Sequence, residues 1–548
     1  MSKSMIKTAI TAHLSTGRVR AVLALGLVTI LVSTGLFARV RAQDIQPEAA
    51  GDLDSSFGTG GKVTSDFGVI ASAANGIALQ GDGKLVIAGA VQLRSGFDFG
   101  LLRLNTDGTL DTSFAEGGGI STDFSGGDDR GLAVALQPDG KIVEAGSATT
   151  ASGGIDFALA RYNTDGTIDT SFGSGGKVTT DFNGRGDRIF AVVVEPNGQI
   201  LAAGFATTSG GDSLAALALY NSNGSLLGKG TADPGVATMI TAMALQSDGK
   251  VVLAGSGTRG TGDDFVVARI NSDTTSDKSF GNNGVVSTDF GGSDDAMAVA
   301  VQPDGKIVAA GITSPAGQFA LARYNTDGSL DSSFGSGGKV ITNSLPKPAF
   351  PAAVLIQPDN KIVVAGMAGM SSSASGKDFA LVRFNTDGSI DSTFGSGGQC
   401  STDFFGSDDG VRTALMQTDG KIVVAGFATH TPGGPPQVAV ARYLSGIAPD
   451  FSISFDQPTV TAPQGTKARV TVKINRIAGF TGNVTVTPPD PTGGIKPKPA
   501  DPVTTSDSSA VFKMKVGAAA ALGPHMLTFT ATDSSGKTRT ATVTIVVQ

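Results

Sequence analysis

The chain has 548 residues, a formal net charge of −7, 77 glycines, one cysteine and three histidines. This length is sufficient for two or three domains, and abundant glycine beside recurring apolar segments favours short strands and tight turns over disorder. An acidic chain without a basic run is unsuited to binding nucleic acid or heparin, and the scarcity of histidine excludes most His-based metal sites and acid–base chemistry.

The first 42 residues have the layout of a secretory signal peptide. They carry six basic residues and no acid, an apolar stretch runs over 21–37, and Val40 and Ala42 occupy the −3 and −1 positions of a small-residue cleavage site. We therefore expect cleavage after Ala42, a linker over 43–50 and a secreted or cell-surface protein. The alternative is an uncleaved membrane anchor, because 17 apolar residues are near the lower limit for spanning a bilayer.

One phrase, such as "ALQPDGKIVEAG", recurs seven times at spacings of 51 to 60 residues. The pattern of each unit predicts four strands. An apolar first strand and a second strand are joined by a "PDGK" turn. After a variable loop, a third strand such as "DFALARYN" is joined by an "NTDG" turn to a fourth strand such as "GKVTTDF". Four short strands per repeat of about fifty residues are typical of a propeller blade. The sequence therefore predicts an all-β, seven-bladed β-propeller over residues 51–446.

The last repeat lacks a fourth strand, but the segment 51–67, "GDLDSSFGTGGKVTSDF", matches the missing piece. We expect residues 62–67 to pair with 438–443 as the outer strand of the seventh blade. This closure leaves no open sheet edge in the ring.

The segments "NTDGTIDTSFGSGGKV", "NTDGSLDSSFGSGGKV" and "QPDGKIVAAG" resemble the delta-60 repeat family of bacterial β-propeller proteins. The resemblance covers about residues 51–443 and implies an extracellular or cell-surface setting. It brings no catalytic residues to carry over. The third unit departs from the pattern, because "YNSNGSLLGKGTADPG" lacks the Asp and Phe of "LDxSF".

The residue pattern changes over residues 447–548, where Val, Thr and Ile recur at every second position and Pro, Gly and Asp turns separate the segments. This pattern predicts a β-sandwich of about seven strands. The segment 479–486, "GFTGNVTV", resembles bacterial immunoglobulin-like modules of secreted proteins, without the Cys pair and Trp of antibody domains.

Third strands carry an Arg, and an Asp follows eight residues later in five units. In the third unit both positions are leucines, Leu219 and Leu227. Both charges are lost together, which is expected if the two residues form an ion pair in the other units, because a lone buried charge is costly whereas replacing both partners by apolar residues is not. We expect Leu219 to contact Leu227. The expected pairs are Arg103 with Asp111, Arg161 with Asp169, Arg269 with Asp277, Arg323 with Asp331, Arg383 with Asp391 and, across the closure, Arg442 with Asp54.

Two sets of polar residues are candidate sites. The turn residues Asn105, Asp107 and Asp111 offer closely spaced oxygens to Ca²⁺, although turn chemistry alone explains them. The connections from each fourth strand to the next blade form an acidic, variable face that a ligand could contact, or else a solvated rim. The acids of this second set are Asp128, Asp129, Asp187, Asp294, Asp295, Asp408 and Asp409.

Two further features favour structural roles. Arg185-Gly186-Asp187 spells an adhesion tripeptide, but the loop pattern already accounts for its Gly and Asp. Cys400 cannot form an intrachain disulfide and is expected to be a small buried side chain.

These observations predict a secreted or surface-attached, monomeric, non-catalytic scaffold that binds an extracellular protein or glycan and needs no cofactor. The alternative is an extracellular polysaccharide hydrolase or lyase that uses acids of the propeller face.

Overall fold

The computed structural model of the protein describes residues 49–548 except 67–68, 94–95, 152, 183–185, 208–212, 233–238, 260–261, 315–316, 343–344, 347–348 and 370–375. The expected signal peptide and nearly all of the expected linker lie outside the described residues. Every regular element within them is a β-strand, and they contain no helix long and apolar enough to cross a membrane.

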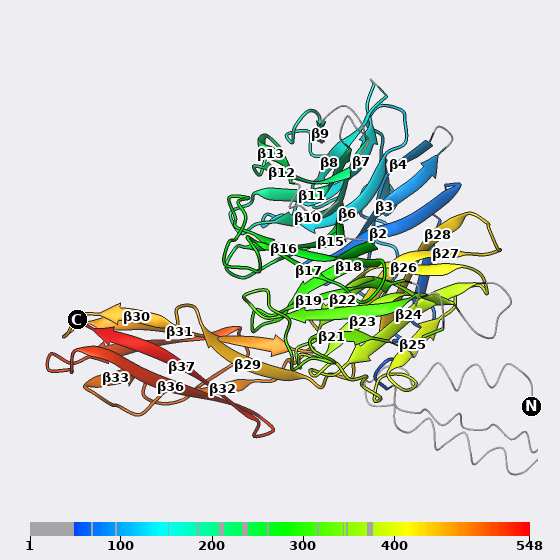
Figure 1. Ribbon diagram of the computed structural model, residues 1–548. Coiled ribbons are helices and arrows are strands. Elements are labelled where there is room, and N and C mark those ends of the chain that lie inside the picture. The colour runs from blue at the N-terminus through cyan, green and yellow to red at the C-terminus, as the bar shows by residue number, and fades with distance from the viewer. Residues whose placement is uncertain are drawn as a thin grey trace, which may run out of the picture. The chain divides into compact units, whose positions relative to one another are not determined.

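Seven four-stranded antiparallel sheets form the blades of the predicted propeller, in chain order from blue to yellow (Figure 1). The innermost strands are β2 (Ala71–Leu79), β6 (Arg130–Leu136), β10 (Asp187–Val194), β14 (Met239–Leu245), β18 (Asp294–Val301), β22 (Ala349–Ile356) and β26 (Asp409–Met416). The second strands are β3 (Leu85–Leu93), β7 (Ile142–Thr149), β11 (Ile200–Thr207), β15 (Val251–Arg259), β19 (Ile307–Thr313), β23 (Ile362–Gly369) and β27 (Ile422–Thr429).

The outer half of each blade completes the sheet. The third strands are β4 (Gly96–Leu104), β8 (Ile155–Tyr162), β12 (Ser213–Tyr220), β16 (Gly262–Ile270), β20 (Gln318–Tyr324), β24 (Lys377–Phe384) and β28 (Pro436–Tyr443). The outermost strands are β5 (Gly119–Thr122), β9 (Lys177–Thr180), β13 (Leu226–Ala232), β17 (Val285–Thr288), β21 (Lys339–Ile341), β25 (Gln399–Thr402) and β1 (Lys62–Ser65).

The seventh blade closes as predicted, with β1 beside β28. Lys62 pairs with Ala441 and Ser65 with Val438. Each innermost strand lies against the next, and β26 lies against β2, so the ring is complete. Phe67, expected within this strand, lies outside the described residues.

Second strands are buried on both sides, as their continuous apolar runs require. The glycine of the repeated "AG" is explained by a β-bulge in every innermost strand. A Cβ on Gly146 would lie 1.9 Å from the carbonyl oxygen of Arg130, and the equivalent glycine of every other blade meets the same obstacle. The bulge therefore dictates a residue without a side chain opposite it.

The third blade differs from the other six. Strand β13 begins directly after the turn at Asn221–Ser225, and its pairing with β12 shifts between Leu219 and Tyr220. The expected Leu219–Leu227 pair is wrong, because Leu219 lies opposite Gly228 and Leu227 is 52% exposed. The third unit lacks the "LDxSF" segment, so its outer strand starts at once and takes a different register.

The C-terminal region is a β-sandwich of nine strands rather than about seven. One sheet contains β29 (Asp450–Phe455), β31 (Lys467–Ile477), β35 (Ser509–Val516) and β33 (Ile495–Lys498). The other contains β30 (Thr459–Ala462), β37 (Thr538–Val547), β36 (Gly523–Asp533), β32 (Val484–Thr487) and β34 (Val503–Thr505). Both sheets contribute to one core that includes Phe451, Phe512 and Phe529.

Candidate functional site

The propeller has two faces with different chemistry. We call the face with the "PDGK" turns and the connections between third and fourth strands the turn face. The opposite face carries the loops between second and third strands and the connections to the next blade, and we call it the loop face. Strands alternate in direction within each blade, so these two sets of connections lie at opposite ends.

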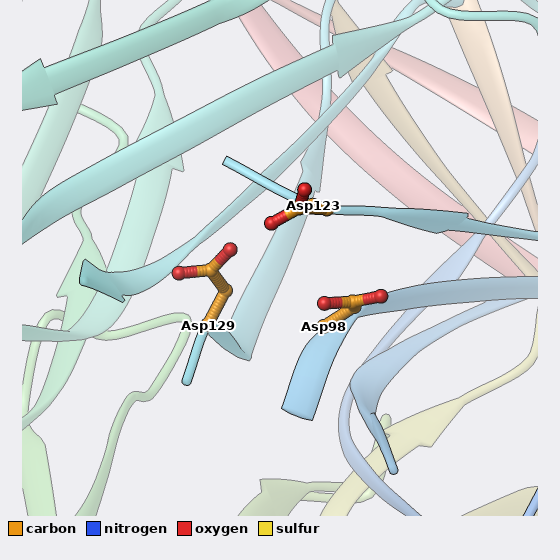
Figure 2. A group of neighbouring side chains, drawn as sticks. All are labelled: Asp98, Asp123 and Asp129. Carbon is orange, nitrogen blue, oxygen red and sulfur yellow. The ribbon is translucent and has the colours of Figure 1, made fainter. Parts of the chain in front are cut away.

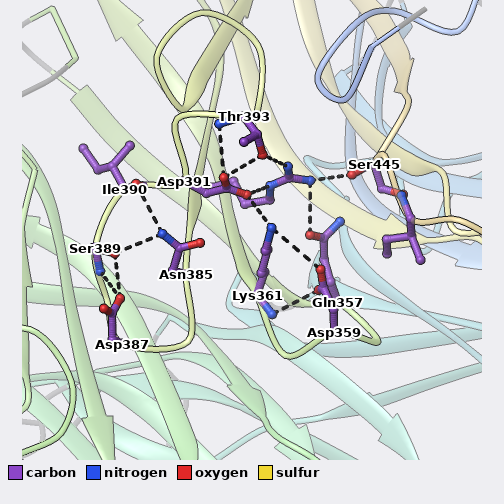
Figure 3. A network of polar contacts seen from close by, with 12 residues as sticks. Gln357, Asp359, Lys361, Asn385, Asp387, Ser389, Ile390, Asp391, Thr393 and Ser445 are labelled. Atoms are coloured by element: carbon purple, nitrogen blue, oxygen red, sulfur yellow. Dashed lines mark hydrogen bonds and ion pairs between the residues drawn. The ribbon is translucent and has the colours of Figure 1, made fainter.

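A repeated ionic network lies on the turn face, and Figure 3 shows it in the sixth blade. Asp391 Oδ2 lies 2.7 Å from Arg383 Nε and 2.8 Å from Lys361 Nζ, and its Oδ1 accepts a hydrogen bond from Thr393. Arg383 also donates to the main-chain carbonyl of Ser445. Burial opposes charge on Asp391, but the bonds from Lys361 and Thr393 and the charge of Arg383 prevail and lower its pKa.

The six ion pairs that the sequence register predicts are present. Their Arg nitrogen and Asp oxygen atoms lie 2.7 or 2.8 Å apart in Arg103–Asp111, Arg161–Asp169, Arg269–Asp277, Arg323–Asp331, Arg383–Asp391 and Arg442–Asp54. Each of these arginines also donates to a main-chain carbonyl of the following blade, at Thr164, Ser222, Thr326, Thr386, Ser445 and Thr106. The network therefore joins neighbouring blades as well as strands of one blade.

The weak Ca²⁺ candidates belong to this turn chemistry. Asp111 pairs with Arg103 and Lys84, and Asp107 accepts hydrogen bonds from the main chain and hydroxyl of Thr109. Asn105 donates to Thr109. The contacts of all three side chains are those of a turn and an ion pair, and they do not form one ligand set.

The acidic candidates of the loop face separate into two groups, because neighbouring residues of a strand point to opposite sides. Asp128 and Asp408 are exposed, and Asp295 is half-buried. Four others are fully buried: Asp129, Asp187, Asp294 and Asp409. Asp187 accepts hydrogen bonds from the main chain of Phe182 and Thr207, so the tripeptide's Asp faces inward, while Arg185 lies outside the described residues.

Each fully buried aspartate belongs to a cluster of three carboxylates that sequence reasoning did not find. In Figure 2, Asp98 of β4, Asp123 after β5 and Asp129 before β6 direct their carboxylates toward one another. One oxygen from each lies within 4.8 Å of the other two. The same grouping occurs in Asp156, Asp181 and Asp187, in Asp264, Asp289 and Asp294, and in Asp378, Asp403 and Asp409.

Burial raises the pKa of two cluster members, Asp156 and Asp409. Burial, with the neighbouring charges of Asp181 and Asp187, raises the pKa of Asp156 to about 6. Burial also raises the pKa of Asp409 to about 7, against the hydrogen bonds from Phe404 and Thr429. The sequence signal for these clusters is the repeated "DF" at the start of third strands and after fourth strands. Aspartate at such positions is equally well explained by turn formation.

The seven bulge residues of the innermost strands are all of different types. We call this set the bulge ring: Asn75, Leu132, Phe190, Thr241, Met297, Ala352 and Arg412. None of them is buried. Phe190 packs on Phe205 with ring centroids 5.7 Å apart, and the Arg412 guanidinium lies 5.2 Å from the centroid of Phe427.

Other aromatic contacts of the loop face also differ between blades. Arg130 lies 4.0 Å from the ring centroid of Phe97, and Phe405 stacks on His430 with centroids 3.7 Å apart. Cys400, expected to be buried, is only half-buried in β25, and desolvation raises its pKa to about 12. That thiol is not a nucleophile at neutral pH.

A family model described as "Domain of unknown function (DUF5122) beta-propeller" matches seven segments of the chain. They are residues 80–114, 137–172, 195–226, 246–280, 302–334, 357–394 and 417–446. These segments are similar to the repeats of a β-propeller family. Each match starts at the turn before the second strand and continues past the end of the third strand, and one match falls in each of the seven blades.

Three solved structures are distantly similar to the chain. A hypothetical protein from Leishmania major is 13% identical over 44% of this chain and 82% of its own, with a TM-score of 0.24. Fructan 1-exohydrolase IIa from Cichorium intybus is 7% identical over 68% of this chain and 96% of its own, also at 0.24.

The fibronectin(III)-like modules of Clostridium thermocellum CbhA are 14% identical over 37% of this chain and 93% of their own, at a TM-score of 0.14. No curated protein matches the chain.

Proposed function

We propose that the protein is a secreted or cell-surface, non-catalytic binding protein whose loop face contacts an extracellular protein or glycan. One observation carries the proposal. Six blades repeat the same ionic network on the turn face, whereas the bulge ring differs in every blade. Bulges re-aim side chains and are common beside functional sites, so a ring of seven different accessible residues is suited to recognising one asymmetric ligand.

The chemistry of the loop face supports binding by aromatic and cationic groups. Phe190, Arg412 and the exposed Phe405–His430 stack offer flat apolar surface and positive charge, and Arg130 pairs with the exposed acid Asp128. Such mixed surfaces are typical of recognition sites in which a few aromatic and Arg side chains supply most of the binding energy.

The remaining parts of the proposal rest on the sequence. The layout of residues 1–42 supports export, and the repeats resemble the delta-60 family. The C-terminal sandwich is proposed to be an immunoglobulin-like spacer or adhesive module. N-terminal sequencing of the exported protein should begin at Gln43, whereas a chain that begins at Met1 would indicate a membrane anchor.

The experiment is a glycan and protein-binding array with the purified protein, followed by calorimetry on each ligand found. We expect Phe190→Ala and Arg412→Ala to weaken binding at least about tenfold, as removal of a binding hot spot does. Leu110→Ala removes an exposed apolar side chain from the turn face and should leave affinity unchanged. Loss of binding in Leu110→Ala, with binding retained in Phe190→Ala and Arg412→Ala, would place the binding site on the turn face and contradict the proposal.

The same preparation distinguishes binding from catalysis. The proposal predicts that array glycans are recovered intact after incubation with the protein. Cleavage that disappears in Asp409→Asn would instead favour the hydrolase or lyase alternative, because Asp409 is the loop-face acid whose pKa is raised to about 7.

A further inference from the structure

We propose that each of the four carboxylate clusters of the loop face binds one divalent cation, with Ca²⁺ the expected ion. Each cluster joins three chain segments from two blades. In the cluster of Figure 2, Asp98 and Asp123 belong to the first blade and Asp129 belongs to the second. A cation at this point would tie the outer half of one blade to the innermost strand of the next.

Asp98 supplies the observation that points to a ligand. Asp98 is 7% exposed, and no described residue donates a hydrogen bond to its carboxylate or forms an ion pair with it. Asp156 and Asp378, at 8% and 6% exposed, are in the same situation. A buried ionised carboxylate without a partner is costly, so three repeated examples aimed at two further carboxylates indicate a positive charge that completes the set.

The other charged groups near the cluster do not supply that charge. Lys177 Nζ lies 2.9 Å from the main-chain carbonyl oxygen of Asp123, above the ring of Phe124, and Arg130 pairs with Asp128. Within the described part of the chain, neither forms an ion pair with Asp98, Asp123 or Asp129. The basic groups are therefore engaged around the cluster and not inside it.

The geometry and the donor atoms suit Ca²⁺. Calcium binds oxygen ligands at about 2.3 to 2.6 Å, so two oxygens on one ion lie no more than about 5 Å apart. The three carboxylate oxygens meet that limit at 4.8 Å. Because every side chain of the four clusters is an aspartate, with no His or Cys, hard cations are favoured over zinc or copper.

Two of the three cluster acids are retained or lost together, whereas the acid after the outermost strand is not, since Asp66 remains in the seventh blade. Wherever the third strand lacks the cluster aspartate, the position before or at the start of the next innermost strand also lacks it. The pairs of residues are Leu214 with Thr238, Gln318 with Ala349 and Gln437 with Ser72. Surface acids that serve only solubility would not have to change together, so the joint change of these two positions supports a shared role for them.

The test is calorimetric titration of EDTA-treated protein with CaCl₂, with the stoichiometry checked by metal analysis after dialysis. We expect four Ca²⁺ per chain and a rise in Tm with CaCl₂, because an ion that binds only the folded state stabilises it. Asp98→Asn should bind one Ca²⁺ fewer. Asp128→Asn, which alters the neighbouring exposed acid, should retain the full number.

Two results would overturn the proposal. One is the absence of both heat and a Tm rise at Ca²⁺ concentrations up to about 10 mM, above the weakest affinities of extracellular Ca²⁺ modules. The other is an unchanged stoichiometry in Asp98→Asn. The Tm of metal-free Asp98→Asn shows that the variant is folded, since removal of one of three like charges should not lower it.

Discussion

In each of six blades, one aspartate of the turn face forms ion pairs with both an arginine and a lysine. Asp54 illustrates the arrangement across the closure, because its Oδ2 lies 2.7 Å from Arg442 Nε and 3.1 Å from Lys421 Nζ, while Oδ1 accepts from Ser56. Its side chain is 4% exposed. Arg442 and Lys421 are therefore paired with a carboxylate that is shielded from solvent.

Replacing Asp54 should destabilise the propeller strongly. Asp54→Ala leaves Arg442 buried without its carboxylate, and breaking one partner of a buried pair costs about 3 to 5 kcal/mol of unfolding free energy. Asp128→Ala, at an exposed loop-face acid, should change it by less than about 0.5 kcal/mol. Urea unfolding of both variants measures the difference, and equal effects would mean that the closure pair contributes little.

The contribution of Asp54 should also depend on pH in one direction. Burial opposes its charge, but hydrogen bonds from Ser56 and Lys421 and the charge of Arg442 lower its pKa from 3.8 to about 2. A lowered carboxyl pKa stabilises the folded state above the unfolded pKa. The stability difference between the native chain and Asp54→Ala should therefore be constant from pH 7 to 5 and shrink as the pH falls from 4 toward 2.

At the scale of elements, strand β1 turns an open array of sheets into a ring. It covers the outer edge of β28, and its preceding segment brings Leu53 beside Tyr443 and Asp54 beside Arg442. Without it, β28 would present unpaired main-chain groups at a sheet edge, which promotes association between molecules.

A chain that starts at residue 66 should therefore be less stable than Asp54→Ala and should aggregate. It loses the ion pair and the hydrogen bonds of β1 together, so the cost should exceed about 5 kcal/mol. Scattering during thermal unfolding, compared with a chain that starts at residue 49, measures this effect. Equal Tm and equal scattering in the two chains would show that closure by β1 is unimportant.

At the scale of the whole molecule, the sandwich has a core of its own. The buried cluster around Phe512 draws its residues from 451–547 alone, and β35 alternates buried and exposed positions as a two-layer structure requires. The propeller cores are separate clusters shared between neighbouring blades.

Residues 447–548 should consequently fold when expressed alone. We expect a single cooperative thermal transition by circular dichroism, because a domain with its own core can fold by itself. Phe512→Ala, which removes a fully buried ring, should lower stability by about 3 to 5 kcal/mol. A non-cooperative transition in the unmodified fragment would contradict the expectation.

The number of blades, the four strands of each, the closure by residues 62–67 (of which 62–65 form β1) and the Arg–Asp pairs could be predicted from the amino-acid sequence. These features depend on contacts within a repeat, where turn residues and a fixed spacing of eight residues bring the partners together, and five repeats show this spacing. The Arg442–Asp54 pair was predictable because the closure restores that local register.

Only the tertiary structure decided which acids of the loop face are surface groups and which form clusters. Asp128 and Asp129 are adjacent in sequence just before β6, yet one is exposed and the other is buried. Each cluster also unites segments of two blades, and such contacts follow from how blades pack and not from any local pattern. The third blade shows the same limit, because a missing segment shifted the register of β13 and exposed Leu227.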